Sequence, residues 1–89
     1  MISPYRETRI DDDTIIREFS SKVNEEDLVW HRDHRSRNIE VLEGGNWKFQ
    51  KDDLLPEIME SGDVIFVEKM TYHRLIRGDG NLHIKITEV

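Results

Sequence analysis

The stretch NIEVLEGGNWKFQ, residues 38–50, predicts the fold class more directly than any other part of the chain. On either side of Gly44-Gly45, apolar and polar side chains alternate, which is typical of strands with one buried face. The glycine pair favours a tight turn, so the whole stretch predicts a hairpin. Trp47 and Phe49 share one face of its second strand, and we expect both on the inner wall of the domain.

Similar patterns extend outward from this hairpin in both directions. Further strands are expected at residues 14–19, 28–33, 54–60, 64–70, 71–76 and 82–89. Residues 20–28 read as a loop or a single helical turn, and residues 1–13 as a loose or lightly paired leader of one domain spanning 1–89. About eight short strands separated by turns predict an all-β fold, either an antiparallel sandwich or a barrel. A barrel would also close the edges that a small sheet leaves exposed.

Length and composition limit the class of function. The 89 residues suffice for one modest core, and a hydrophobic content of 36% predicts a thin core that a homodimer contact would complete. The formal net charge of -6 argues against a nucleic-acid partner, because such proteins need a basic surface. The chain has no cysteine, which excludes a thiolate metal site and fits a cytoplasmic location.

A membrane location is not expected either. No apolar run approaches the roughly 20 residues that cross a bilayer. The first residues, MISPYRETRIDDD, lack the apolar segment of a signal peptide.

The stretch LVWHRDHRSRN, residues 28–38, concentrates side chains that are able to do chemistry. On a strand, His31 and Asp33 would face the same side while Arg32 points away. His73 lies on another expected strand and is the best candidate for a third ligand. Two imidazoles and one carboxylate form the facial triad associated with non-haem Fe(II), and the same set also binds Zn, Mn, Ni or Co.

A second interpretation of this stretch needs no metal. A His-x-Asp pair often arises by chance, so His31 and Asp33 would then be solvated side chains at a strand end. The local excess of arginine suits a small anion better than a polymer. His34 falls outside the strand alternation and is expected to point outward, as are Trp30 and Tyr72.

Two motifs, in this order along the chain, resemble those of the cupin family. The first family motif reads G-(x)5-H-x-H-(x)3,4-E-(x)6-G. His31 matches its first histidine, Asp33 stands at its second, and Gly44 or Gly45 matches its final glycine. The motif's glutamate falls on Arg37 or on the following residue, so the usual carboxylate ligand is missing.

The second family motif reads G-(x)5-P-x-G-x-x-H-(x)3-N. Gly62 and His73 match its first glycine and its histidine at the right spacing. The chain departs from the motif at Glu68, Met70 and Arg77, which stand at its proline, its second glycine and its asparagine. Together the two motifs cover about residues 25–77.

The resemblance implies a small conical β-barrel, a cupin-like jelly roll that is often dimeric, with the site inside. There His31, Asp33 and His73 would hold a divalent metal such as Fe, Mn, Ni or Zn. Two states stay open: a three-ligand metal with Arg37 clamping a ligand, and a metal-free anion pocket. Pocket-lining residues Trp47 and Phe49 would contact a small anionic or sugar-like molecule.

Three functions fit these expectations. The first is a metal-dependent cupin that binds or acts on a small molecule, and the second is a metal-free cupin module for binding or assembly without catalysis. The third is an Fe(II)/2-oxoglutarate oxygenase, in which the basic residue about ten positions beyond the second histidine would be His83 or Lys85. Whether the protein is an enzyme stays open at this level.

Overall fold

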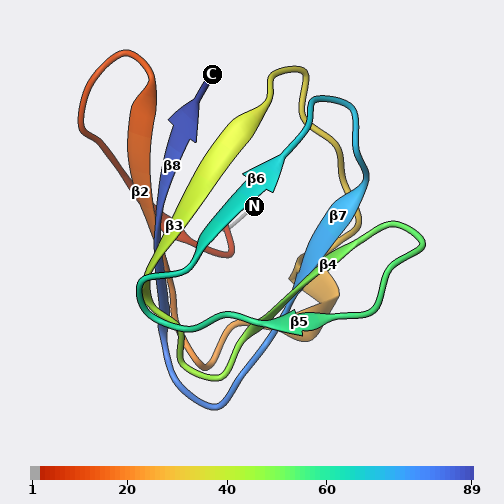
Figure 1. Cartoon of the computed structure of the whole chain (residues 1–89). Coiled ribbons are helices and arrows are strands. Elements are labelled where there is room, and N and C mark those ends of the chain that lie inside the picture. Colours follow the sequence, from red (N-terminus) through yellow and green to blue (C-terminus); the bar gives the residue numbers. More distant parts are fainter. Residues whose placement is uncertain (1–2) are drawn as a thin grey trace.

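The computed structural model describes residues 3–89, which form two antiparallel sheets. One sheet has five strands in the order β1-β2-β8-β3-β6, and the other has three in the order β5-β4-β7 (Figure 1). The strands are β1 (Arg6–Arg9), β2 (Thr14–Phe19), β3 (Arg37–Glu43), β4 (Lys48–Lys51), β5 (Glu57–Ile58), β6 (Val64–Val67), β7 (His73–Ile76) and β8 (Leu82–Glu88). A 3-10 turn, η1 (Glu25–Asp27), precedes β3. Within the described range, no helix is both long and apolar enough to cross a membrane.

The two sheets face each other like the walls of an open cone. They meet at one end, where the β3–β4 and β7–β8 turns lie, and they splay apart at the other end (Figure 1). This arrangement confirms the all-β jelly roll expected from the sequence. The wide end leaves space between the sheets, and the narrow end is filled by side chains.

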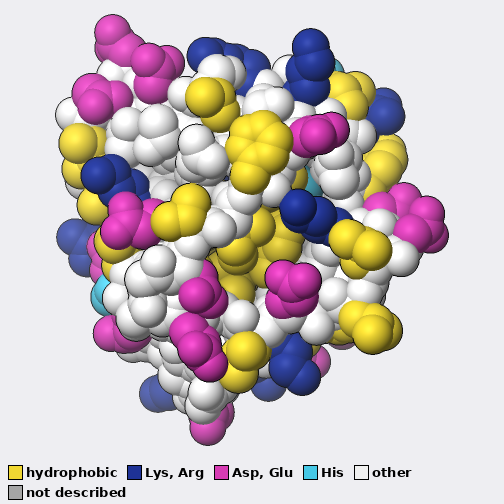
Figure 2. Space-filling model, in the orientation of Figure 1, with side chains coloured by type: hydrophobic (Ala, Val, Ile, Leu, Met, Phe, Trp, Pro, Cys, Tyr) yellow, Lys and Arg dark blue, Asp and Glu magenta, His cyan; other side chains and the backbone are white. Residues whose placement is uncertain are grey.

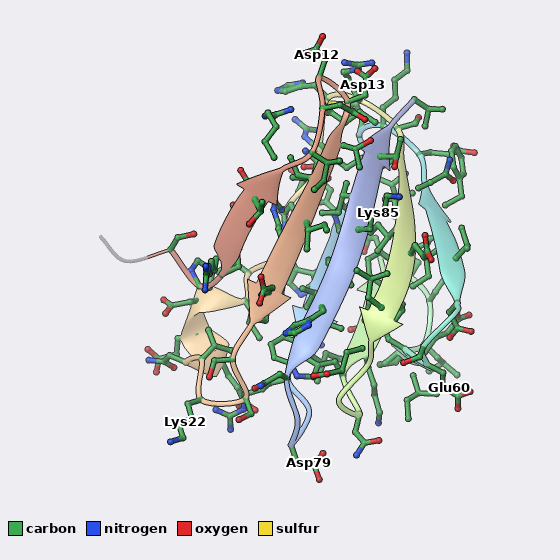
Figure 3. All side chains as sticks on the ribbon, turned by 90° about the vertical axis from the view of Figure 1, so that its left-hand side faces the viewer. Asp12, Asp13, Lys22, Glu60, Asp79 and Lys85 are labelled. Atoms are coloured by element: carbon green, nitrogen blue, oxygen red, sulfur yellow. The ribbon has the colours of Figure 1, made fainter. Side chains whose placement is uncertain are left out.

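Alternation along each strand decides which side chains fill the core. On β8, Leu82, Ile84 and Ile86 are buried, and on β3 the buried positions are Ile39 and Val41. Full burial of such a side chain contributes about 1.5–3 kcal/mol to stability. The remaining buried hydrophobic residues are Ile15, Phe19, Trp47, Phe49, Met59 and Val67. Figure 3 views the five-stranded sheet from outside, where Lys85 of β8 lies on the face opposite this core.

Two turns interlock at the narrow end of the cone. Gly45 has a φ of 56°, in the left-handed region that favours glycine, and its carbonyl accepts a hydrogen bond of 3.0 Å from the Gly80 amide. Trp47 Nε1 donates to the Gly80 carbonyl at 2.7 Å, and Asn46 Nδ2 donates to Asp79 Oδ1 at 2.8 Å. These contacts join the ends of both sheets.

The expected strand at residues 28–33 is wrong. Only His31 in this range pairs, through an isolated bridge to His73, and the strand begins instead at Arg37. Asp33 and its charged neighbours favour strands poorly, and the segment leaves the five-stranded sheet to reach β7 of the other sheet.

The other expected strands are present, with shorter bounds in several cases. The strand interrupted by Pro56 is reduced to Glu57–Ile58 at the edge of its sheet, as proline there predicts. Within the expected leader, Arg6–Arg9 forms strand β1 and pairs along its whole length with β2. Residues 1–2 of that leader lie outside the described range.

Candidate functional site

A cavity of about 310 Å³ lies between the sheets, towards the wide end of the cone. This volume is at the lower end of the range for small-molecule sites, about 300–1,000 Å³. Figure 2 shows a hollow in this face, with hydrophobic side chains inside it and charged side chains around it. The lining residues are Pro4, Tyr5, Arg17, Phe19, Asp27, Leu28, Val29, His31, Asp33, Arg37, Ile39, Phe49, Val67, His73, Leu75, Ile84 and Ile86.

Backbone hydrogen bonds bring the segment before β3 into contact with the start of β7. The His31 amide donates to the His73 carbonyl at 3.0 Å, and the His73 amide donates back to the His31 carbonyl at 2.9 Å. The Met70 amide donates to the Asp33 carbonyl at 2.7 Å. Main-chain hydrogen bonds therefore hold the segment with His31 and Asp33 against the segment with His73. The first of these segments does this without forming a regular strand.

The Met70 backbone explains why the resembled motif carries a glycine at this position. Met70 has a φ of 64°, which a side chain tolerates only at a cost of about 1–2 kcal/mol. Its amide is the donor to Asp33, so the strained turn helps to hold a candidate ligand in place. Gly62, the first glycine of the same motif, also has a positive φ of 94°.

His31, Asp33 and His73 converge at one side of the cavity. One ligand atom from each residue can be chosen so that all three lie within 4.8 Å of one another. His73 Nε2 lies 3.3 Å from Asp33 Oδ2. Two neighbouring ligands at about 2.0–2.2 Å from one ion lie about 3.0–3.5 Å apart, so this pair already has suitable spacing. The ring of His31 packs against that of His73, with the ring centroids 4.3 Å apart.

The backbone also selects the ligand nitrogen of each histidine. Nδ1 of His31 lies 3.1 Å from the Val29 carbonyl oxygen, and Nδ1 of His73 lies 2.8 Å from that of Thr71. A carbonyl only accepts hydrogen bonds, so the proton of each neutral ring sits on Nδ1. The lone pair then lies on Nε2, as a metal ligand requires.

Two of these ligand atoms face each other without a hydrogen bond between them. Burial lowers the pKa of His73 and outweighs the Thr71 carbonyl and the Asp33 carboxylate, which act in the opposite direction, so the neutral form of the ring is favoured. Asp33 Oδ2 is buried and has no hydrogen-bond partner among residues 3–89. A lone pair on His73 Nε2 therefore meets a carboxylate oxygen, and a cation between them satisfies both. The donor set fits a divalent metal.

Arg37 lies beside the three candidate ligands and is not one of them. Its Nη1 is 3.4 Å from Asp33 Oδ1 and its Nη2 is 3.8 Å from Glu88 Oε2. The side chain is only 17% exposed, and its buried Nε has no hydrogen-bond partner within the described range. The Asp33 carboxylate thus directs Oδ1 to the guanidinium and Oδ2 to His73. Glu40 lies on the opposite face of β3 and is exposed, so it cannot supply the carboxylate that the resembled motif has.

The two expected aromatic contacts separate in the structure. Phe49 lines the cavity and stacks on His73, with ring centroids 5.5 Å apart. Trp47 is fully buried and does not line the cavity, which corrects its expected role as a ligand contact. The reason is that its indole extends into the narrow end, where it holds Gly80.

Several other side chains lie outside the cavity lining. His34 is exposed, as expected, and neither His83 nor Lys85 reaches the cavity. The basic residue that an Fe(II)/2-oxoglutarate oxygenase would take from the last strand is therefore absent from the lining. Trp30 and Tyr72 are exposed on the outer side, where Arg74 and Arg32 stack on them.

Arg17 is a cavity residue that the sequence analysis did not single out. It lies on β2 between Ile15 and Phe19, which are both buried, and it lines the cavity. The alternation along residues 14–19 was sufficient to place Arg17 on the inner face. The strand itself is present as expected, and the alternation within it is the one signal in the sequence that points to Arg17.

Comparisons with known proteins identify the fold. The sequence matches no protein-family model and no curated protein. Among solved structures, the DMSP lyase DddQ from Ruegeria pomeroyi DSS-3 superimposes with a TM-score of 0.74 at 14% identity, over 88% of this chain and 39% of the lyase. A cupin domain from Bordetella pertussis Tohama I matches with a TM-score of 0.67 at 15% identity, over 100% of this chain and 98% of that one.

A third similar structure is that of an iron protein. Fe(II) HppE matches with a TM-score of 0.66 at 18% identity, over 85% of this chain and 41% of that protein. The chain thus spans well under half of the lyase and of HppE, and nearly all of the Bordetella domain. The protein has the cupin fold, as the two sequence motifs suggested.

Proposed function

We propose that this protein is a metal-binding cupin whose barrel also holds a small anionic or sugar-like molecule. His31, Asp33 and His73 would bind the metal, and Arg37 would contact the ligand. The observation that carries the proposal is the facing pair of His73 Nε2 and Asp33 Oδ2, 3.3 Å apart at the cavity wall. A bound divalent ion would act there as a Lewis acid that orients and polarises a ligand oxygen.

Arg37 supports the ligand half of this proposal. Its guanidinium is mostly buried, yet its contacts to Asp33 and Glu88 are longer than good charge-assisted hydrogen bonds of about 2.7–2.9 Å. A buried donor left without a partner costs about 1–3 kcal/mol. A carboxylate or phosphate in the cavity would supply the missing acceptors.

Metal analysis of protein purified without a histidine tag tests the metal half. We expect about one equivalent of a divalent metal after incubation with Fe(II), Mn(II), Ni(II) or Zn(II). Asp33→Asn should weaken binding beyond the 10- to 100-fold that is typical for loss of an outer-shell contact. Asp12→Asn, the same change at an exposed position, is the matched control. Sub-stoichiometric metal that no added ion increases would overturn the proposal.

The second candidate is a metal-free cupin module for binding or assembly, without catalysis. It is favoured by one observation: a permanent cation, Arg37, at or next to the position where the resembled motif has a carboxylate ligand. In that case, phosphate or small carboxylates should raise the melting midpoint in the presence of a chelator. Arg37→Ala should abolish these shifts, and an unchanged shift would remove the anion pocket.

We also propose that the protein forms a homodimer through the edge strand β6. Val64 and Phe66 of this strand are exposed, and β6 is an outer strand of the five-stranded sheet. An apolar edge with free backbone groups favours pairing with another copy. Light scattering should give twice the chain mass for the wild type and a monomer for Phe66→Glu. A monomeric wild type at all concentrations would refute the dimer.

A further inference from the structure

The cavity has a second cationic position, formed by Arg17 on β2. Its side chain is 18% exposed and lines the same cavity as Arg37. Arg17 shares the inner face of its strand with Ile15 and Phe19, so the fold directs it between the sheets.

Only part of the Arg17 guanidinium is engaged. Nε donates to Glu7 Oε1 at 2.8 Å, and the guanidinium carbon lies 4.2 Å from the centroid of the Tyr5 ring. Within residues 3–89, Nε makes the only side-chain hydrogen bond of Arg17. Both Nη atoms therefore have donor capacity for an acceptor in the cavity.

Strand register separates the two arginines along and across the sheet. Arg17 pairs with Ile84, which pairs with Val41, whereas Arg37 lies four residues before Val41 on β3. At about 3.3 Å per residue and 4.8 Å per strand, the two positions differ by roughly 13 Å along β3 and roughly 10 Å across the sheet. The two side chains thus approach the cavity from different parts of its wall.

The wall between the two arginines is apolar. Ile39, Ile84 and Ile86 of the same sheet line it, and Phe49 contributes from the opposite sheet. A polar group placed against this wall would lose its hydration without gaining a partner. A ligand that spans the cavity therefore fits best with polar ends and an apolar middle.

We propose that the ligand of this cavity is a small dianion, with two acidic groups joined by an apolar segment. One acidic group binds at the Arg37 and metal-ligand end, and the other binds Arg17 through its Nη atoms. This inference rests on the proposed function, because it extends the ligand that Arg37 holds. Arg17 then determines specificity for a dianion over a monoanion of the same length.

Glu7 competes for the same cation. Its side chain is 39% exposed and reaches only the Nε side of Arg17. An ion pair this exposed is weak, so it holds Arg17 in place without satisfying it. Removal of the Glu7 charge should strengthen dianion binding, which is the opposite effect from removal of Arg17.

Calorimetric titration of the full chain, loaded with Zn(II), tests the inference. The probes are the dicarboxylates from succinate to suberate and the monocarboxylates of equal carbon number. At the best length, we expect the dicarboxylate to bind about tenfold or more tightly than the monocarboxylate. Arg17→Gln should abolish that preference and retain monocarboxylate binding, which also shows that the variant is folded.

Two further variants complete the test. Glu7→Gln should tighten dicarboxylate binding about two- to fivefold. Arg6→Gln makes the same charge change as Arg17→Gln, but on the outer face of β1 next to Glu18, and should leave both series unchanged. If the wild type binds both series equally and Arg17→Gln changes nothing, the second anion position is refuted while the Arg37 pocket stands. If neither series binds the wild type, the ligand half of the proposed function fails as well.

Discussion

Asp33 makes separate contacts through three of its oxygens. Its carbonyl accepts from Met70, Oδ1 faces Arg37 at 3.4 Å and Oδ2 faces His73 at 3.3 Å. The chain departs from the resembled motif at Asp33 and at or beside Arg37. The charges of these two residues are opposite and compensate each other. The aspartate supplies a negative charge that a histidine would lack, and the arginine beside it is thereby paired. Repulsion between Arg37 and a metal is reduced for the same reason.

His73 should make the stability of the metal-free protein depend on pH. Burial lowers its pKa below the usual 6.5, so the unfolded chain takes up a proton before the folded one. The stabilisation is present above pH 6.5 and is lost as the pH falls through the lower folded-state pKa. The charged groups that face the ring, His31, Asp33 and Arg37, are unchanged in His73→Gln.

Urea unfolding with a chelator, between about pH 5 and pH 8, measures this dependence. We expect the wild type to lose stability more steeply than His73→Gln as the pH falls below 6.5. Parallel curves for the two proteins would show that the ring is protonated equally in both states.

At the scale of elements, the narrow end depends on two turns that pack against each other. A Cβ on Gly45 would lie 2.3 Å from the Asn81 carbonyl oxygen, and one on Gly78 would lie 2.2 Å from the Gly45 carbonyl oxygen. The β3–β4 and β7–β8 connections thus need glycine for close approach as well as for turn geometry. This contact closes the cone and places Trp47 away from the cavity.

Gly45→Ala should be much more destabilising than Gly62→Ala. Both residues have positive φ, and that strain alone costs about 1–2 kcal/mol. Gly62 has open space around its Cβ position, whereas Gly45 meets backbone atoms, which adds about 1–3 kcal/mol of overpacking. Denaturant unfolding of both variants measures the difference. Equal losses would show that the close approach of the turns is unimportant.

At the scale of the whole molecule, the two ends of the cone differ in how completely side chains fill the space between the sheets. Side chains such as Leu82 and Met59 fill the narrow end, and the wide end keeps a cavity of about 310 Å³. The cavity wall carries Ile39, Ile84 and Ile86, which also belong to the buried core. Anything that binds in this cavity would stabilise the folded state by its binding free energy.

Metal binding should raise the melting midpoint clearly. A metal at a hundred times its Kd stabilises the folded state by about 2.7 kcal/mol. In a domain of this size, each kcal/mol shifts the midpoint by about 4–8 °C, so we expect a rise of roughly 10–20 °C. Differential scanning calorimetry with and without Zn(II) measures it. An identical rise in Asp33→Asn would mean that the metal binds elsewhere.

The sequence by itself predicted the strands other than the one expected at residues 28–33, the turns and the three candidate ligands. A period of two along residues 38–50 and 82–89 identifies the buried faces, because side chains of a strand alternate whatever the strand packs against. Motif spacing brought His31, Asp33 and His73 together before any contact was known. The strand patterns depend only on neighbouring residues. The spacing of the three candidate ligands repeats that of a motif which belongs to a whole fold.

Only the tertiary structure decided how the remaining groups are used. It moved residues 28–33 out of the sheet, paired Arg37 with Asp33 and Glu88, and placed Trp47 at the narrow end. It also showed that Arg17 reaches the cavity used by Arg37. Each of these outcomes depends on contacts between segments far apart along the chain. A periodic pattern shows which way a side chain points, but the partner that it meets is set by the packing of the two sheets.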